Sequence, residues 1–164
     1  MNQIVTLSVE DSVTEQILTC FDRYKYNKDN LITNIEEVST VNGIQTENAL
    51  ELKDFQQDLD FNESLSHILN IIHNKIFLNL SYYYVHFVEY DRGGYQIAHN
   101  HAHAEDYSCV LYLNTCEGGE TYFDDVSFAP TKGNMIIFPS YLNHGSKETR
   151  SFKTVLVLGM RKCS

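Results

Sequence analysis

The chain of 164 residues has no tryptophan and only two prolines, and basic side chains are scarce, with 12 Lys and Arg against 22 Asp and Glu. The resulting formal charge of −10 argues against a surface that tracks the phosphates of nucleic acid. No apolar run reaches the roughly 18 residues needed to cross a bilayer, and the polar N-terminus is unlike a signal peptide. We therefore expect a cytoplasmic protein with neither a membrane nor a nucleic acid as partner.

The chain also lacks a CxxC pair, an internal repeat and a linker-like stretch. Its four cysteines are scattered, which favours reduced thiols over disulfides. Hydrophobic residues make up 43% of the chain and charged residues 21%, an ordinary globular composition. These observations predict a single domain over residues 1–164.

Two patterns divide this domain. Ser12 and Glu15 form a capping-box pattern before an amphipathic helix, an apolar stripe predicts a second helix over residues 62–80, and Asn42-Gly43 between them suggests a tight hairpin turn. From Tyr82 onward, runs rich in Tyr, Val, Ile and Phe predict short strands over 82–90, 95–103, 107–114, 120–123, 134–139 and 152–161. We predict an α+β fold, with residues 1–81 as mostly helical support and 82–164 as an antiparallel sandwich or small barrel.

Histidines carry the strongest functional signal. His99, His101 and His103 alternate, so a strand over 95–103 would present all three imidazoles on one face. His144 follows a later strand and could approach them from across the sandwich. Neutral imidazoles clustered in this way suit a divalent transition metal. The alternative for the alternating set is a solvated strand face, and we assign no role to the remaining histidines, His67, His73 and His86.

The segments around these histidines follow a recognisable order. Tyr90-Asp91-Arg92-Gly93-Gly94 leads to His99, and Leu111-Tyr112-Leu113-Asn114 precedes Gly118-Gly119-Glu120-Thr121-Tyr122-Phe123. Pro130-Thr131-Lys132-Gly133, Phe138-Pro139-Ser140 and His144-Gly145 then follow. This order resembles the double-stranded β-helix (jelly-roll) core of the iron(II)/2-oxoglutarate dioxygenases, in particular their prolyl-4-hydroxylase-like group. The GGET stretch is the most specific part of the resemblance.

The resemblance implies His99, His101 and His144 as the metal ligands. The usual set in that family is His-x-Asp/Glu…His, so His101 occupies the carboxylate position here. A second register, His103-Ala104-Glu105, restores a carboxylate but misplaces the Tyr-Gly anchor, which leaves open whether Glu105 or Asp106 replaces or joins His101. In the first register, Glu105→Ala and Asp106→Ala are expected to leave metal affinity nearly unchanged.

Further residues are implied for the co-substrate. Lys153 lies nine positions after His144, where the resemblance implies a basic residue that pairs with the far carboxylate of 2-oxoglutarate, and Arg150 is the fallback. Tyr90 and Tyr112 match tyrosines that line the co-substrate pocket. The implied function is an Fe(II)- and 2-oxoglutarate-dependent oxygenase that uses O2 to hydroxylate a small-molecule or peptide substrate, of the amino-acid or prolyl type.

Two other readings remain open at the level of sequence. Gly93, His99-x-His101 and Glu105, with Gly133, Pro139 and His144 later, are similar to the two cupin motifs. They imply a three-histidine metal protein that acts without 2-oxoglutarate. The other reading is a degenerate barrel retained as a binding module, for which we expect no iron(II) binding.

Overall fold

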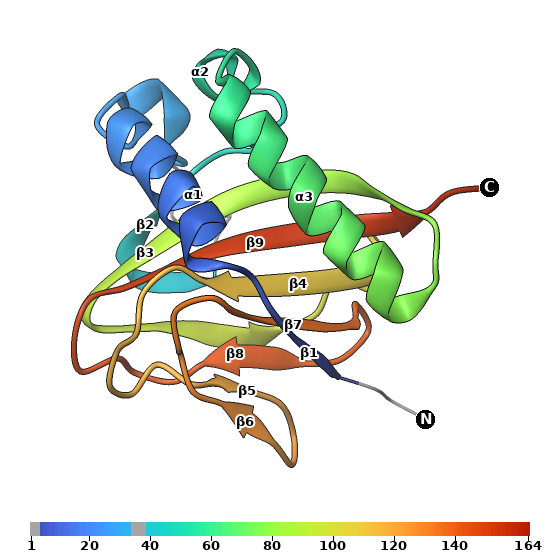
Figure 1. Ribbon diagram of the computed structural model, residues 1–164. Coiled ribbons are helices and arrows are strands. Elements are labelled where there is room, and N and C mark those ends of the chain that lie inside the picture. Colours follow the sequence, from blue (N-terminus) through green and yellow to red (C-terminus); the bar gives the residue numbers. More distant parts are fainter. Residues whose placement is uncertain (1–3, 34–38) are drawn as a thin grey trace.

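A computed structural model describes residues 4–33 and 39–164 (Figure 1). The helices are α1 (Asp11–Tyr24), α2 (Lys53–Gln56) and α3 (Leu59–Ile76), with a short 3-10 turn at Lys28–Asn30. The strands are β1 (Val5–Ser8), β2 (Thr40–Gln45), β3 (Leu80–His99), β4 (Tyr107–Tyr112), β5 (Thr121–Tyr122), β6 (Ser127–Phe128), β7 (Asn134–Pro139), β8 (His144–Ser146) and β9 (Lys153–Lys162). They pair antiparallel in the order β1-β7-β4-β9-β3-β8-β5-β6, with β2 also beside β3. The predicted α+β fold with a jelly-roll core is confirmed.

The central strands are apolar on both faces, and alternate residues serve two different cores. On β3, Phe87 packs toward the helices, where its ring stacks on Phe21 of α1 at a centroid distance of 4.6 Å. Its neighbours Val88 and Tyr90 belong to a second apolar cluster with Tyr112. Because side chains alternate across a strand, one face of the sheet is left for the helices, which lie together on that side in Figure 1. The other face lines the interior of the curled sheet.

Strand β3 joins the two halves of this curl. Its first part pairs with β9 from Leu80 to Tyr90, and its end pairs with β8 at Gln96 and His99. Between these stretches Gly93 has a φ of +85°, a backbone conformation that a side chain would strain. The predicted strands 82–90 and 95–103 are therefore one bent strand that carries the chain from the helix-covered layer into the layer of β8.

Several local predictions need correction. The Ser12/Glu15 capping box is wrong, because α1 is preceded by Glu10, which makes no side-chain cap. The second helix begins earlier than residue 62, at Leu59, and is capped by the Asp58 side chain, which accepts from the Phe61 N–H. It ends at Ile76 and is followed by Phe77 in a left-handed conformation. The predicted end at residue 80 is too late, because the apolar periodicity of the sequence continues past the end of the helix.

The Asn42-Gly43 hairpin is also wrong. Both residues lie inside β2, which runs alongside β3 with a register shift between Val41 and Gly43. A side chain at Gly43 would place its Cβ 2.4 Å from the Glu89 carbonyl oxygen. The glycine thus permits close packing of two strands at a bulge and does not form a hairpin turn.

The first 81 residues contribute strands as well as helices. Strand β1 pairs with β7 and β2 pairs with β3. The N-terminal segment therefore adds two strands to the sheet in addition to the helices that cover it. Cys20, Cys109, Cys116 and Cys163 are all free thiols. In the described ranges, no helix combines the length and the apolar character that a membrane span requires.

Candidate metal centre

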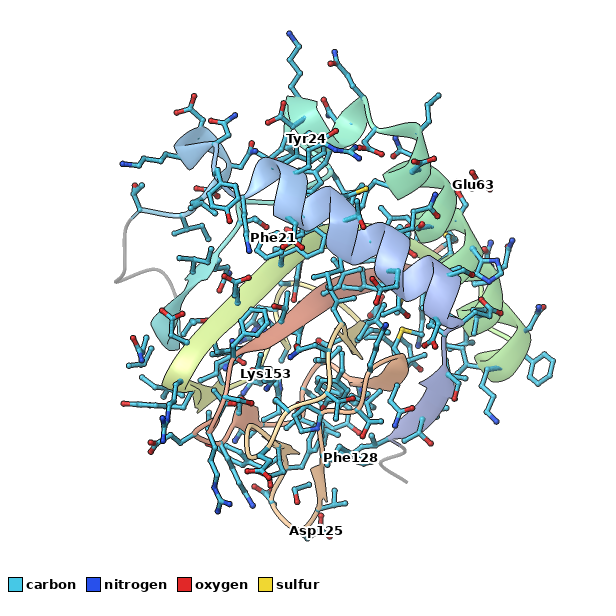
Figure 2. The ribbon with its side chains drawn as sticks, turned by 60° about the vertical axis from the view of Figure 1, so that its left-hand side comes forward. Phe21, Tyr24, Glu63, Asp125, Phe128 and Lys153 are labelled. Carbon is cyan, nitrogen blue, oxygen red and sulfur yellow. The ribbon has the colours of Figure 1, made fainter. Side chains whose placement is uncertain are left out.

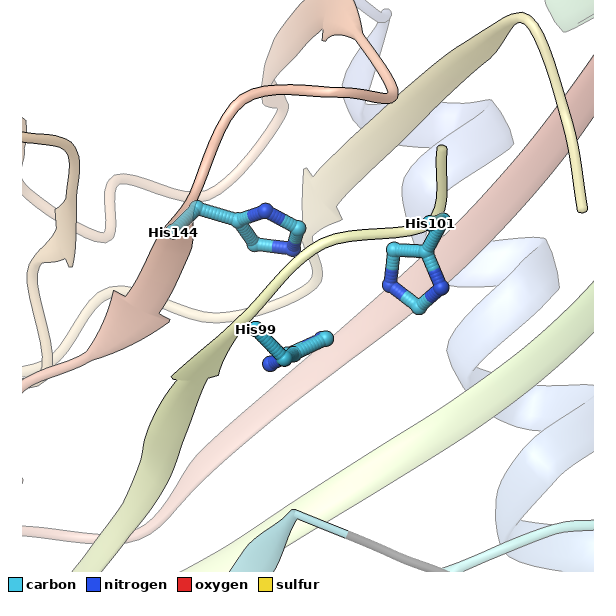
Figure 3. Close-up of side chains that lie close together, drawn as sticks. All are labelled: His99, His101 and His144. Atoms are coloured by element: carbon cyan, nitrogen blue, oxygen red, sulfur yellow. The ribbon is translucent and has the colours of Figure 1, made fainter. Parts of the chain in front are cut away.

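Three histidines meet where two neighbouring strands and the turn that follows one of them come together. His99 is the last residue of β3, His144 is the first residue of β8, and His101 follows two positions after β3 ends (Figure 3). Their ring centroids are 4.5 Å apart for His99–His144, 4.8 Å for His99–His101 and 5.5 Å for His101–His144. One ligand nitrogen from each lies within 4.8 Å of the other two.

The geometry of the first two rings determines which nitrogen is free. The Nδ1 atom of His99 lies 2.7 Å from the Ile97 carbonyl oxygen, and that of His144 lies 3.0 Å from the Leu142 carbonyl oxygen. A carbonyl oxygen can only accept, so each Nδ1 carries the proton in the neutral ring. The Nε2 lone pairs are therefore available to a metal, an arrangement typical of histidine ligands.

Burial keeps the cluster neutral. It lowers the pKa of His101 to about 4, with a smaller contribution from His99, and it lowers the pKa of His144 to about 4. The pKa of His99 is lowered for the same reason. Neutral imidazoles have a free lone pair near physiological pH, and a set of three nitrogen donors suits a divalent transition metal such as iron(II).

A cavity of about 500 Å³ opens over these rings. Its wall includes His86 of β3, to which no role was assigned from sequence. The His86 ring stacks on Tyr84 at 5.1 Å, and burial lowers its pKa to about 3. The signal was present in the sequence, because His86 shares the strand alternation of Val88 and Tyr90, which point into the same interior. The rest of the lining comprises Ser39, Gln45, Gln96, Ile97, Ala98, Val110 and Val157.

Lys153, the first residue of β9, is buried inside the sandwich with only 2% of its surface exposed (Figure 2). Its ammonium donates to the Gly119 carbonyl oxygen and to Ser146 Oγ, both at 2.7 Å. No carboxylate of the described residues forms an ion pair with it. Burial lowers the pKa of Lys153 to about 8, as expected for a cation held away from water.

The two tyrosines expected near the co-substrate flank this lysine. The Lys153 Nζ lies 4.8 Å from the ring centroid of Tyr90 and 5.9 Å from that of Tyr112. The Tyr112 hydroxyl donates to Thr121 Oγ1 at 2.6 Å, and both side chains are buried. Tyr90, Tyr112 and Lys153 therefore form one wall of the interior, whereas Arg150 is exposed outside it.

The structure does not bring His103 and a neighbouring carboxylate together with His144, as the alternative alignment of the metal motif would require. His103 lies in an exposed turn outside the group of three histidines, because β3 ends at His99 and the predicted alternation stops there. Asp106 is exposed, and its carboxylate accepts from the Lys162 N–H. Glu105 is buried behind His101, with Oε1 at 3.7 Å from His101 Nδ1, and is not among the gathered ligand atoms. Burial raises its pKa to about 7.

The chain is similar to a known protein family and to several solved structures. Residues 81–160 match the family described as the 2OG-Fe(II) oxygenase superfamily. A search among curated proteins gave no match. Solved structures with the same fold include a Pseudomonas putida prolyl-4-hydroxylase, with a TM-score of 0.67 and 16% identity over 100% of this chain and 95% of that one.

Two further structures are similar. A Trichoplax adhaerens prolyl hydroxylase, in complex with a hypoxia inducible factor peptide fragment, has a TM-score of 0.73 and 15% identity over 99% of this chain and 84% of that one. A viral collagen prolyl hydroxylase from Paramecium Bursaria Chlorella virus-1, in complex with 2OG, has a TM-score of 0.64 and 16% identity over 98% and 96%. The chain is therefore similar to the 2OG-Fe(II) oxygenase superfamily over residues 81–160, just under half of its length. It is an oxygenase with iron(II) as cofactor and 2-oxoglutarate as co-substrate.

Proposed function

We propose that the chain hydroxylates an amino-acid or peptidyl substrate of the prolyl type, with iron(II) held by His99, His101 and His144. The donor set fits the ion, since three neutral imidazoles converge and at least two of them have Nε2 free. When bound, iron(II) and 2-oxoglutarate supply the oxygen chemistry, in which O2 and 2-oxoglutarate are consumed and succinate and carbon dioxide are released.

The observation that carries the co-substrate assignment is the unpaired ammonium of Lys153. A buried cation without an anion is costly, so this lysine calls for a negatively charged ligand. It bonds to Ser146, which lies two residues from His144 on the same face of β8, a separation of about 6.6 Å along a strand. A dicarboxylate that reaches from the histidine cluster to Lys153 matches 2-oxoglutarate.

The ligand set also favours a dianionic co-substrate. Replacing the family's usual carboxylate by His101 raises the net charge of the ligand set by one unit. The metal centre with the larger positive charge attracts a dianionic acid more strongly. The cavity walls then have the task of orienting the substrate and keeping bulk water away from the reacting atoms.

Support for a peptidyl substrate comes from the relatives and from the cavity. Each of the three similar structures is a prolyl hydroxylase, and one of them holds a peptide fragment. The cavity is open to solvent at exposed Ile97 and carries polar groups at Ser39, Gln45 and Gln96, which can bond the backbone amides of a peptide.

The test is an assay with iron(II), 2-oxoglutarate and a panel of proline-containing peptides and free amino acids. We expect one oxygen atom to be added to one class of substrate, with an equal amount of succinate. The His144→Ala protein serves as the control and is expected to be inactive. Substrate oxidation that needs no 2-oxoglutarate would instead favour the cupin-like alternative, in which the three histidines act without the co-substrate.

A further inference from the structure

His101 differs from the other two histidines in what holds its ring. His99 and His144 each bond through Nδ1 to the backbone carbonyl two residues earlier, Ile97 and Leu142. His101 has no such bond to a described residue, and its Nδ1 instead faces Glu105 Oε1 at 3.7 Å. In residues 4–33 and 39–164 no other carboxylate lies within 4.0 Å of a nitrogen of the three rings.

A tight turn places Glu105 behind His101. The Ala104 and Glu105 N–H groups both point at the His101 carbonyl oxygen, at 2.9 and 3.3 Å, and the His101 N–H donates to the Ser140 carbonyl oxygen at 2.9 Å. Ser140 Oγ in turn donates to the Glu105 carbonyl oxygen. The backbone on both sides of the pair is thereby fixed, so the approach of the two side chains follows from the turn.

The carboxyl group of Glu105 is held by two hydroxyl groups. The Tyr84 hydroxyl donates to Oε1 at 2.7 Å and Ser108 Oγ donates to the same atom at 2.8 Å. The side chain has no exposed surface, and Oε2 has no hydrogen-bond partner among the described residues. Gly159 of β9 makes the room, because a Cβ there would lie 1.6 Å from Oε2. The oxygen that faces His101 is Oε1, which already accepts these two hydrogen bonds, whereas the unpartnered Oε2 lies beside Gly159.

We propose that Glu105 is the positioning residue for His101: its carboxyl accepts the His101 Nδ1–H and directs Nε2 to the metal. The inference rests on the proposed function, since it takes His101 as a ligand. The present 3.7 Å exceeds a hydrogen-bond distance, so the ring and the carboxyl must approach by about 0.5–1 Å for the bond to form. All three histidines then present Nε2, two held by carbonyls and one by a carboxyl.

In the family's usual ligand set a carboxylate binds the metal directly. In this chain a histidine takes that position and the carboxyl group of Glu105 lies behind it. A carboxyl that accepts from a metal-bound imidazole fixes the ring and raises its basicity, and loss of such a partner typically costs 10- to 100-fold in metal affinity. The expectation from sequence that Glu105→Ala leaves metal affinity nearly unchanged is therefore replaced, because the burial and contacts of Glu105 could not be seen there. The same expectation for Asp106 stands.

The first test needs no variant. In the intact metal-free protein labelled with ¹⁵N, the His101 ring is expected to carry its proton on Nδ1, with Nε2 showing the shift of an unprotonated nitrogen. A proton on Nε2 of His101 overturns the proposal. This measurement is independent of oxygenase activity.

The second test compares Glu105→Leu, Glu105→Gln and Asp106→Asn by anaerobic iron(II) titration. Leucine removes the acceptor and is expected to weaken iron binding by about 10- to 100-fold and to mix the His101 tautomers. Glutamine keeps an acceptor oxygen, so it should retain the tautomer and most of the affinity. Asp106→Asn changes an exposed neighbouring carboxylate and should change neither quantity.

The outcomes separate the two proposals. Wild-type affinity and an unchanged His101 tautomer in folded Glu105→Leu would make Glu105 a purely structural residue and overturn this inference alone. Failure of the wild-type protein to bind iron(II) would overturn the proposed function as well. If Glu105→Leu does not fold, the ¹⁵N measurement on the wild-type protein decides the question.

Discussion

His99 and His144 are direct Cα partners in the ladder between β3 and β8, and their ring centroids lie 4.5 Å apart. Residues distant in sequence are thereby fixed opposite each other by the register of two antiparallel strands. Phe138 packs on the His144 ring at 4.7 Å and limits its rotation. The pair therefore forms a rigid half of the metal centre, whereas His101 comes from the turn beyond β3.

Removal of either partner of this pair is expected to abolish tight iron binding. His99→Ala and His144→Ala each leave two imidazoles, which hold a labile divalent ion poorly against solvent. The measurement is an anaerobic iron(II) titration by equilibrium dialysis. His103→Ala is the matched control, since that histidine is exposed and outside the cluster, and it should bind one equivalent. Stoichiometric iron in the His144→Ala protein would refute the ligand assignment.

Lys153→Ala is expected to weaken 2-oxoglutarate binding while it leaves iron binding nearly intact. Loss of a hydrogen bond to a charged group in a secluded pocket costs on the order of 1.5–3 kcal/mol, or roughly 10- to 150-fold in affinity. Calorimetric titration of 2-oxoglutarate into the iron-loaded protein measures the change. Arg150→Ala removes an exposed charge and serves as the control. The opposite pattern, with Arg150 critical and Lys153 not, would assign the co-substrate to Arg150.

The pKa of Lys153 predicts a pH dependence of 2-oxoglutarate affinity. Burial lowers that pKa to about 8, so the ammonium is fully present near pH 7 and is lost as the pH rises through 8. The affinity for 2-oxoglutarate should therefore fall between about pH 7.5 and 9.5. An ordinary lysine, with a pKa of about 10.4, keeps its charge over this range. The slope should disappear in Lys153→Ala. An equal slope in that variant would locate the titration elsewhere.

The same shift has a consequence for stability. The unfolded chain keeps the Lys153 proton up to the ordinary pKa, whereas the folded chain releases it near pH 8, so the unfolded state binds more protons between these values. Stability of the protein without co-substrate should thus rise with pH in this window through Lys153. Denaturant titrations at pH 7.5 and 9.5 on wild type and Lys153→Ala measure this contribution as their difference.

His101→Asp creates the histidine–carboxylate–histidine set that the resemblance leads one to expect. Iron should stay bound, because the added negative charge compensates for the shorter side chain. Binding of 2-oxoglutarate should weaken, since one unit of net positive charge is removed at the metal centre. Parallel titrations with iron(II) and 2-oxoglutarate test both effects. Complete loss of iron in His101→Asp together with full retention in His101→Ala would place the third ligand elsewhere.

Much of the fold could be predicted because its signals are local. The apolar face of α1 and the strands over 107–114, 134–139 and 152–161 appear as β4, β7 and β9 within a few residues. Strands β5, β6 and β8 contain only two or three residues each. The predicted strand over 120–123 includes β5, but β6 and β8 are too short for their sequence periodicity to indicate a strand. Their existence depends on pairing with distant strands, a tertiary property.

The site was predictable in its residues but less so in its geometry. His99, His101 and His144 meet as the motifs implied, yet His101 arrives by a turn and not by strand alternation. Glu105 was visible only as a possible ligand, because its position behind His101 depends on Tyr84, Ser108 and the space over Gly159. These partners come from three strands, so no local pattern could have indicated them.

The most direct test of the account is an anaerobic iron(II) titration of the wild-type protein with and without 2-oxoglutarate, followed by visible absorption. We predict one equivalent of iron bound in both cases and a weak charge-transfer band that develops only when 2-oxoglutarate is present. The band should be absent in His144→Ala and should require far more 2-oxoglutarate in Lys153→Ala. Iron binding without the band at any 2-oxoglutarate concentration, or no iron binding at all, would contradict the account.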